Sequence, residues 1–166
     1  MALAIILGML SFETPHGQFN YRVAAVIMRK DEVLLQVIGD QPYWCLPGGR
    51  VDFGESGEEA MRREIVEELG VEPRIERLLW MVENIYRQRG TRFHEASLYY
   101  LASLPEGSPE AAAQTPWKTA EEDGTPLLNQ WHPVDGLEAV YLLPTFLRTR
   151  LRNLPPTLEY ILHRDP

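Results

Sequence analysis

Three glutamates stand close together in the segment GEEAMRREIVEEL, at positions 64, 67 and 68. With about 100° between successive residues of an α-helix, Glu64, Glu67 and Glu68 share an arc of roughly 100°. Like charges at these spacings destabilise a helix by about 0.2–0.5 kcal/mol per pair. A hard divalent cation with oxygen ligands would turn this repulsion into attraction. The pattern therefore indicates a metal site, and its alternative is an acidic helix face exposed to solvent.

The residues around these glutamates define the helix that must carry them. Ser56 is a good N-cap, and Glu59 three positions later completes a capping box. Gly70 follows the last periodic residue, as expected of a glycine just beyond a helix C-terminus. The acidic arc borders a stripe of apolar residues that we expect to face the core: Met61, Ile65, Val66 and Leu69. The sequence thus predicts a helix over 57–69 whose glutamates lie at the edge of the domain body.

Apolar runs on both sides of this helix predict strands. Before it, 23–28 and 33–38 form a hairpin whose polar loop is somewhat longer than the two-residue kind. After it, 74–86 and 92–104 form a second hairpin around a loop at 88–91. Between the first hairpin and the helix lies the segment GDQPYWCLPGGRVDFGESG, whose Gly and Pro content predicts an ordered but irregular loop.

The C-terminal third of the chain is less regular. Residues 105–126 are rich in Pro and poor in large apolar side chains, so we expect a long exposed loop that acts as a mobile specificity loop. Trp131 is expected to open a last short strand, and Pro144 the first turn of a helix over 144–153. Strands that alternate with two helices indicate an α/β (α+β) domain with a mixed sheet.

Length and charge limit the classes of function. The chain has 166 residues, which predicts one domain over 1–166. Its formal net charge of −8 argues against broad binding to duplex nucleic acid or to an anionic membrane. The one cysteine cannot form an intramolecular disulfide, and the apolar start of the chain lacks the basic residues of a secretory signal, because Arg22 is the first Lys or Arg. We expect a cytoplasmic protein in which 1–20 form an arm or an extra strand.

A longer pattern surrounds the three glutamates. From Gly49 the chain has five residues, Glu55, seven residues and then the run REIVEELGV over 63–71. This order resembles the signature box of the Nudix hydrolases, Gly-x5-Glu-x7-Arg-Glu-aliphatic-x-Glu-Glu-x-Gly-aliphatic, at every defined position. Pro47 and Gly48, the usual lead-in to the box, are also present. The resemblance implies a Nudix-like three-layer α/β/α sandwich around a mixed β-sheet.

The resemblance also implies a reaction. Nudix hydrolases use Mg²⁺ or Mn²⁺ to hydrolyse a pyrophosphate bond in a nucleoside diphosphate joined to another group, as in nucleotide sugars, dinucleotides and nucleoside triphosphates. By their positions in the box, the implied metal ligands are Glu64, Glu67 and Glu68. Glu64 and Glu67 also belong to the implied catalytic set, in which Arg63 and Glu55 orient the carboxylates. Bound metal would let an acidic protein hold an anionic substrate.

The remaining site residues are less closely defined. Gly48 and Gly49 are expected to contact the substrate, and Glu122 is a candidate for a further metal ligand because it precedes Trp131 in the late loop. The general base stays open between a box glutamate and a later acid. The later acids considered are Glu83, Glu95, Glu121, Glu122 and Asp123. For each of these, the alternative is an acid on an exposed loop or strand.

Substrate recognition is indicated only by residue type. Three arginines around the turn at Gly90 could reach outer phosphates as charge-assisted donors, or form a polar hairpin tip: Arg87, Arg89 and Arg92. Four aromatic residues could stack on a nucleobase, or simply pack: Tyr43, Trp44, Tyr86 and Trp117. The sequence does not identify the nucleotide.

The sequence lacks the motifs of several other enzyme classes. The four histidines show no zinc spacing, and no Walker, GxGxxG or GxSxG motif is present. The main alternative is a Nudix domain that senses a nucleotide without hydrolysing it. Such sensors commonly lose a box glutamate, whereas this chain keeps every one. We therefore expect an enzyme whose partner is a small nucleotide, with homodimer formation left open.

Overall fold

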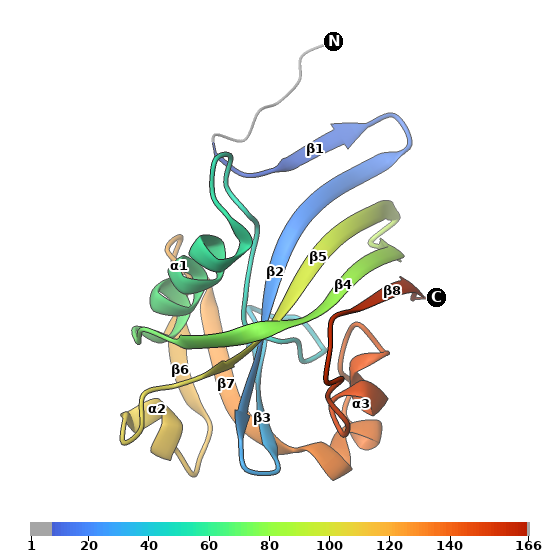
Figure 1. The fold of residues 1–166 in the computed structure, drawn as a ribbon. Coiled ribbons are helices and arrows are strands. Elements are labelled where there is room, and N and C mark those ends of the chain that lie inside the picture. Colours follow the sequence, from blue (N-terminus) through green and yellow to red (C-terminus); the bar gives the residue numbers. More distant parts are fainter. Residues whose placement is uncertain (1–7, 166) are drawn as a thin grey trace.

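The computed structural model describes residues 8–165, in which a curved sheet carries helices on both faces (Figure 1). Residues 1–7, part of the segment expected to form an arm or an extra strand, lie outside the described residues. In chain order the elements are β1 (Ser11–Thr14), β2 (Gly17–Arg29), β3 (Glu32–Ile38), α1 (Gly57–Leu69), β4 (Arg74–Gln88), β5 (Thr91–Ser103), α2 (Pro109–Ala112), β6 (Trp117–Ala120), β7 (Pro126–Pro133), the 3₁₀ helix η1 (Val134–Ala139), α3 (Leu147–Arg150) and β8 (Glu159–Arg164).

The sheet is mixed, as the sequence predicts. Its strand order is β6-β7-β3-β2-β5-β4-β8, and β1 pairs with β2 as an extra strand. The pairs β2–β5 and β4–β8 are parallel, whereas the other neighbours are antiparallel. The long strand β2 lies at the centre, so side chains that alternate along it reach both faces of the sheet (Figure 1).

Two separate hydrophobic clusters show that the sheet is covered on both faces. On one face, Ala25 and Ile27 of β2 pack in the cluster that contains the apolar side of α1. On the other face, Val26 packs in the cluster that contains residues of η1 and α3. The two helical layers lie on opposite sides of the strands in Figure 1. This arrangement confirms the three-layer α/β/α architecture. Among residues 8–165 no helix is both long and apolar enough to span a membrane.

Helix α1 begins and ends as predicted. The Ser56 side chain accepts a hydrogen bond from the Glu59 amide, and the Glu59 carboxylate accepts one from the Ser56 amide. Gly70 ends the helix in the left-handed conformation, with φ of 74°. The prediction that Val66 faces the core is wrong, because its side chain is 41% exposed while the other three residues of the apolar stripe are buried.

The two predicted hairpins are present, and both turns are tighter than expected. Arg29 pairs with Glu32, so only two residues connect β2 and β3. This short turn is feasible because Lys30 adopts a φ of 52°. In the second hairpin Gln88 pairs with Thr91, which leaves Arg89 and Gly90 as the connection between β4 and β5.

The long loop predicted over 105–126 is exposed, as expected, but it contains regular structure. The segment contains α2 and β6, and β6 pairs with β7. Side chains from the body of the domain also hold its backbone. The Arg29 guanidinium donates to the carbonyl oxygens of Ala111 and Ala113 at 3.0 and 2.7 Å, and the Trp131 indole donates to that of Glu110 at 3.0 Å. These contacts fasten the segment to the sheet, so it is a poor candidate for a mobile loop.

The C-terminal prediction is also incomplete. Trp131 lies near the end of β7 and does not open it, because pairing of Gln36–Ile38 with the residues before Trp131 extends the strand back to Pro126. The helix expected over 144–153 is reduced to the single turn of α3. Strand β8 was not predicted, and it covers the outer edge of β4.

Candidate active site

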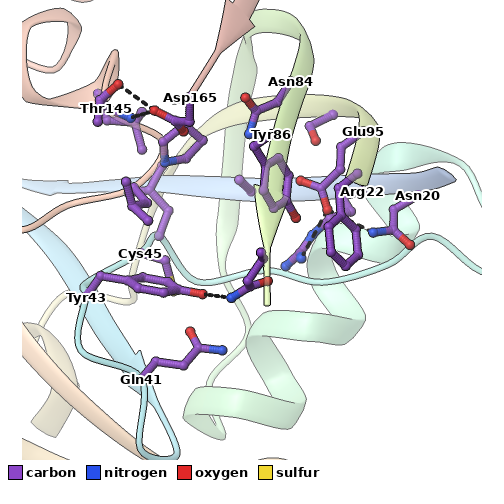
Figure 2. Close-up of a pocket in the computed structure, with 18 of the residues that line it drawn as sticks. Asn20, Arg22, Gln41, Tyr43, Cys45, Asn84, Tyr86, Glu95, Thr145 and Asp165 are labelled. Carbon is purple, nitrogen blue, oxygen red and sulfur yellow. Dashed lines mark hydrogen bonds and ion pairs between the residues drawn. The ribbon is translucent and has the colours of Figure 1, made fainter. Parts of the chain in front are cut away.

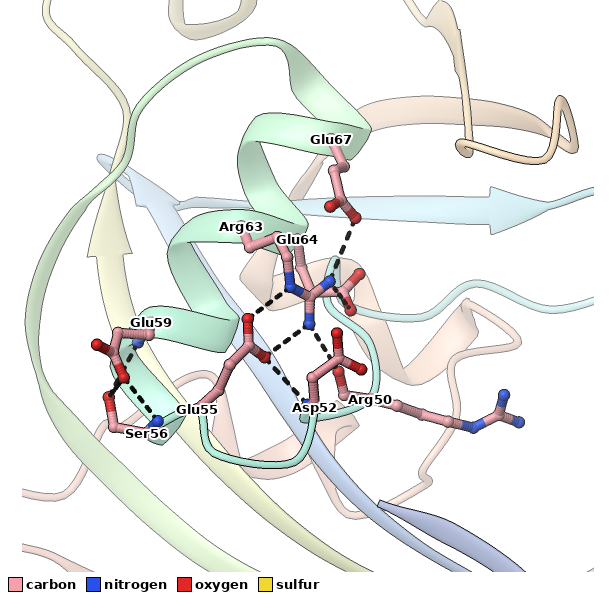
Figure 3. A network of polar contacts seen from close by, with 8 residues as sticks. All are labelled: Arg50, Asp52, Glu55, Ser56, Glu59, Arg63, Glu64 and Glu67. Carbon is pink, nitrogen blue, oxygen red and sulfur yellow. Dashed lines mark hydrogen bonds and ion pairs between the residues drawn. The ribbon is translucent and has the colours of Figure 1, made fainter. Parts of the chain in front are cut away.

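Arg63 is the centre of the charged network on α1 (Figure 3). Its guanidinium donates two hydrogen bonds to the carboxylate of Glu55, at 2.8 and 2.9 Å. The same group reaches Glu64 at 3.0 Å and Glu67 at 3.3 Å, and it donates to the carbonyl oxygen of Arg50 at 3.0 Å. The hydrogen bonds from Arg63 lower the pKa of Glu55. The arginine therefore fixes the positions of three carboxylates and ties them to the loop before the helix.

Glu68 differs from the other two glutamates because it has no cationic partner among the described residues. It is 1% exposed, and its carboxylate accepts hydrogen bonds from the Gly48 amide at 3.1 Å and from Gln36 Nε2 at 3.0 Å. Burial raises its pKa well above the ordinary value, and the charges of Glu121 and Glu64 act in the same direction. A buried carboxylate with neutral donors alone is destabilising unless a positive charge joins it.

The two glycines before the helix let the backbone lie close to β2 and to the Glu64 side chain. The segment around Gly48 and Gly49 runs beside β2, where the Val23 amide donates to the Gly49 carbonyl at 2.9 Å. A Cβ atom on Gly49 would lie 2.2 Å from the Glu64 carboxylate. A Cβ on Gly48 would lie 2.3 Å from the Val23 carbonyl oxygen, and Gly48 has a φ of 139°. The first glycine is thus required by the backbone, and the second by the space that the Glu64 side chain needs.

The carboxylate oxygens of these side chains are the kind of ligand that a divalent cation such as Mg²⁺ prefers. Among residues 8–165, no three acidic, cysteine or histidine side chains stand close enough to hold a metal ion as they are oriented. The reason is that Arg63 lies between Glu55, Glu64 and Glu67. Mg²⁺ keeps several of its waters, so a few protein carboxylates suffice. Glu68, buried and lacking a counter-charge, is the ligand with most to gain from such an ion.

Among the later acids, Glu121 is the one whose charge acts on this cluster. The charge of Glu121 contributes to the raised pKa values of Glu64 and Glu68. Burial also raises the pKa of Glu121 itself, with further contributions from Asp123 and Glu67. Glu122, which the sequence analysis favoured, is exposed and lies one position beyond it. Glu121 is therefore the better candidate for a further ligand or a general base.

A cavity of about 800 Å³ opens on the sheet face opposite α1 (Figure 2). Its floor is formed by β2, β5 and β4, whose register places Asn20 beside Glu95 and Glu95 beside Asn84. The Asn20 amide donates to the Glu95 carboxylate at 2.9 Å. Asn84 is 4% exposed, and its Oδ1 has no partner among the described residues. A polar row at the centre of a sheet is costly, so it suits a ligand that hydrogen-bonds to it.

Several predicted substrate residues meet at this cavity. Arg87, Arg89, Tyr43 and Tyr86 all line it, whereas Arg92 lines a separate, smaller pocket at the hairpin tips. The Tyr43 hydroxyl accepts a hydrogen bond from Gln88 at 2.7 Å, which holds its ring at the rim. The other two aromatic candidates pack elsewhere. Trp44 lies edge-on against His132, and Trp117 packs against the cluster under α1.

Other cavity residues were missed from the sequence. They include Asn20, Arg22, Arg50, Asn84 and Phe93. Four of these five could have been found, because residues two apart on a strand share one face of the sheet. Asn20 and Arg22 are two apart on β2, and Asn84 on β4 and Phe93 on β5 each have a polar or aromatic neighbour two positions away. Polar side chains at the inward positions of a strand are the signal that alternation offers. Arg50 carries no such signal, because it lies in the irregular loop.

The NUDIX domain family model matches residues 18–154, which is most of the chain. The chain belongs to the Nudix family. It is 31% identical to a MutT NUDIX hydrolase of Burkholderia pseudomallei whose crystal structure covers 71% of this chain and is itself covered to 85%, with a TM-score of 0.51. The match supports both the family and the fold.

Two curated relatives of the Nudix chain are similar over shorter stretches. An RNA pyrophosphohydrolase of Haemophilus influenzae is 31% identical over 117 residues, which are 64% of this chain and 59% of the relative. An ADP-ribose pyrophosphatase of Methanocaldococcus jannaschii is 33% identical over 92 residues, which are 54% of this chain and 53% of the relative. The chain thus spans little more than half the length of these relatives.

Proposed function

We propose that this Nudix domain hydrolyses a pyrophosphate bond in a nucleoside diphosphate joined to another group, with Mg²⁺ or Mn²⁺ as its cofactor. The observation that carries the proposal is Glu68, a buried carboxylate without a cation, beside Glu64 and Glu67. A site selected for stability alone would place an apolar or neutral residue there. The two curated relatives are named for different substrates, but both names describe hydrolysis of a pyrophosphate bond.

Each box residue has a role that follows from its contacts. Arg63 holds Glu55, Glu64 and Glu67 around one guanidinium, so the three carboxylates are oriented toward one another, and a small rotation of their side chains would let them share a cation. Glu68 is held by the Gly48 amide and Gln36 and cannot swing out to solvent. Bound metal would supply charge neutralisation of the pyrophosphate and activation of a water molecule. Burial raises the pKa of Glu121, so its carboxylate is a stronger base than an exposed one, and we assign it the role of general base.

The cavity on the sheet face opposite α1 suits the nucleoside. Tyr86 and Phe93 stack on one another at its wall, with ring centroids 5.0 Å apart, and present an aromatic surface. Asn84, buried with an unpaired acceptor, offers a hydrogen-bonding edge of the kind that reads a nucleobase. A volume of about 800 Å³ is in the range of small-molecule sites.

The test is turnover of a panel of nucleotide sugars, dinucleotides, nucleoside triphosphates and 5′-triphosphate RNA, with Mg²⁺, with Mn²⁺ and with EDTA. We expect metal-dependent release of phosphate products from at least one class. Glu68→Gln should abolish it, and Glu58→Gln, an exposed change on the first turn of α1, should not. Tight binding of one nucleotide without turnover would instead support the nucleotide-sensing alternative.

We also propose that the protein works in a reducing compartment such as the cytoplasm. Cys45 is its one cysteine and is free. Desolvation raises the pKa of the Cys45 thiol to about 12, so the group is neutral at pH 7 and packs as a small apolar side chain. Cell fractionation of the tagged protein tests the location.

A further inference from the structure

Two arginine side chains enter the cavity next to each other. Arg22 of β2 and Arg50 of the loop before α1 face one another in an isolated antiparallel bridge, and both line the cavity. Directly opposite residues of an antiparallel pair project to the same side, so both side chains leave the backbone toward the cavity and the charge of Arg22 acts on Arg50. Like charges in this position are destabilising. The pair therefore calls for a negative partner.

Arg22 has such a partner, and Arg50 does not. Arg22 lies 3.7 Å from the Glu95 carboxylate, toward which it points in Figure 2. Arg50 makes no ion pair within the described residues. The one hydrogen bond that its side chain donates there is from Nη1 to the Met9 sulfur at 3.6 Å, and its Nε is buried without a partner. Burial and the charge of Arg22 both lower the pKa of Arg50.

The position of Arg50 links the two halves of the site. Its carbonyl oxygen accepts a hydrogen bond from Arg63, so its backbone belongs to the carboxylate cluster. Its side chain extends away from that cluster (Figure 3). The negative charges of Glu95 on the cavity side and of Glu64 on the α1 side both act on this guanidinium. Arg50 thus lies where a nucleotide in the cavity would pass toward the metal ligands.

We propose that Arg50, with Arg22 beside it, binds the phosphate group attached directly to the nucleoside. The proposal rests on the proposed function and adds a residue-level site for one part of the substrate. A phosphate there would give the Arg50 Nε its missing acceptor and would neutralise the repulsion between the two arginines. The ligand class is a nucleoside 5′-phosphate unit, which is also the product released after hydrolysis.

Binding without metal or turnover tests this site separately from catalysis. Calorimetric titration in EDTA compares guanosine and adenosine 5′-monophosphates with the same nucleosides lacking phosphate, in low-salt buffer. We expect the wild type to bind at least one monophosphate about 10- to 100-fold more tightly than its nucleoside. Arg50→Gln should remove that difference, and Arg50→Lys should restore part of it. Arg74→Gln removes an equal charge from an exposed position outside the cavity and should leave the difference intact.

Thermal melting separates binding from a structural role. Without ligand, Arg50→Gln should melt at or above the temperature of the wild type, since it removes the charge repulsion from Arg22 and breaks no ion pair of the described residues. With monophosphate, only the wild type and Arg50→Lys should gain in melting temperature. The proposal is overturned if the wild type binds monophosphate no better than nucleoside, or if Arg50→Gln keeps the full difference. It is also overturned if Arg50→Gln melts far below the wild type in the absence of ligand.

Discussion

Replacing Glu68 by Gln isolates the electrostatic effect of the buried carboxylate. The amide has nearly the same shape and keeps an oxygen that can accept from the Gly48 amide. Its new NH₂ group would meet Gln36 Nε2, but Gln36 Oε1 is buried without a partner. A flip of the Gln36 amide therefore gives both side chains a hydrogen bond. The substitution removes a buried negative charge. It leaves one unpaired atom on Gln36, as before, because Nε2 takes the place of the unpaired Oε1.

We expect this change to stabilise the metal-free protein and to destabilise the metal-bound protein relative to the wild type. Replacing buried ionic groups by neutral ones is often stabilising by about 1–4 kcal/mol, and we take about 1–2 kcal/mol for Glu68→Gln in EDTA. For a domain of this size, that gain raises the melting temperature by about 2–8 °C. With Mg²⁺ at about 100 times its dissociation constant, the wild type gains about 2.7 kcal/mol that the variant largely lacks.

The assay is thermal melting of both proteins in EDTA and in a titration of Mg²⁺ and Mn²⁺. The two melting curves should exchange order as metal is added. Glu67→Gln serves as a comparison, because Glu67 is more exposed and pairs with Arg63, so its loss should give no gain in EDTA. A Glu68→Gln protein that melts well below the wild type in EDTA, with an unchanged response to metal, would refute the reasoning. Glu68 would then be a structural hydrogen-bond acceptor.

Three further predictions concern the same cluster. Arg63→Ala should lower turnover by at least about tenfold, because three carboxylates lose the donor that orients them. Its melting temperature in EDTA should be no higher than that of the wild type. Normal kinetics would contradict this. Gly49→Ala should fold yet lose metal affinity, measured by calorimetry, because its Cβ displaces the Glu64 carboxylate, whereas Gly48→Ala should fail to fold stably. In EDTA the free energy of unfolding of the wild type, relative to Glu68→Gln, should fall as pH rises from about 4.5 through the raised pKa of Glu68. The reason is that Glu68 keeps its proton to higher pH in the folded state than in the unfolded chain. Urea titrations between pH 4.5 and 8 that show no such trend would oppose the assignment.

The parts of the fold that the sequence predicts are those set by local interactions. Helix α1 is defined by Ser56, Glu59 and Gly70, each of which acts within one turn of the chain. The two hairpins follow from apolar runs around short polar turns. The cluster of Arg63 with the box carboxylates, named from the resemblance, is found as a set of hydrogen bonds, while its role in binding metal remains a prediction.

The parts that it does not predict depend on long-range contacts. Over 105–126 the composition favours a loop, but pairing of β6 with β7 and the hydrogen bonds from Arg29 and Trp131 give the segment structure. Strand β8 forms because the edge of β4 is available to it, which its own short sequence cannot reveal. The pairing of Arg50 with Arg22 likewise arises from a loop that crosses β2. Such partners lie far apart in the chain, and periodicity within a segment does not identify them.

The central claim is that the carboxylates of α1 bind a divalent metal for hydrolysis of a pyrophosphate bond. Its most direct test is the rate of product release from the substrate panel by the wild type and by Glu68→Gln, each with Mg²⁺ and with EDTA. The account predicts turnover by the wild type with Mg²⁺ alone, and a loss of about 100-fold or more in the variant, because removal of metal-based transition-state stabilisation is worth several kcal/mol. Turnover that persists in EDTA, or that Glu68→Gln leaves unchanged, would contradict it.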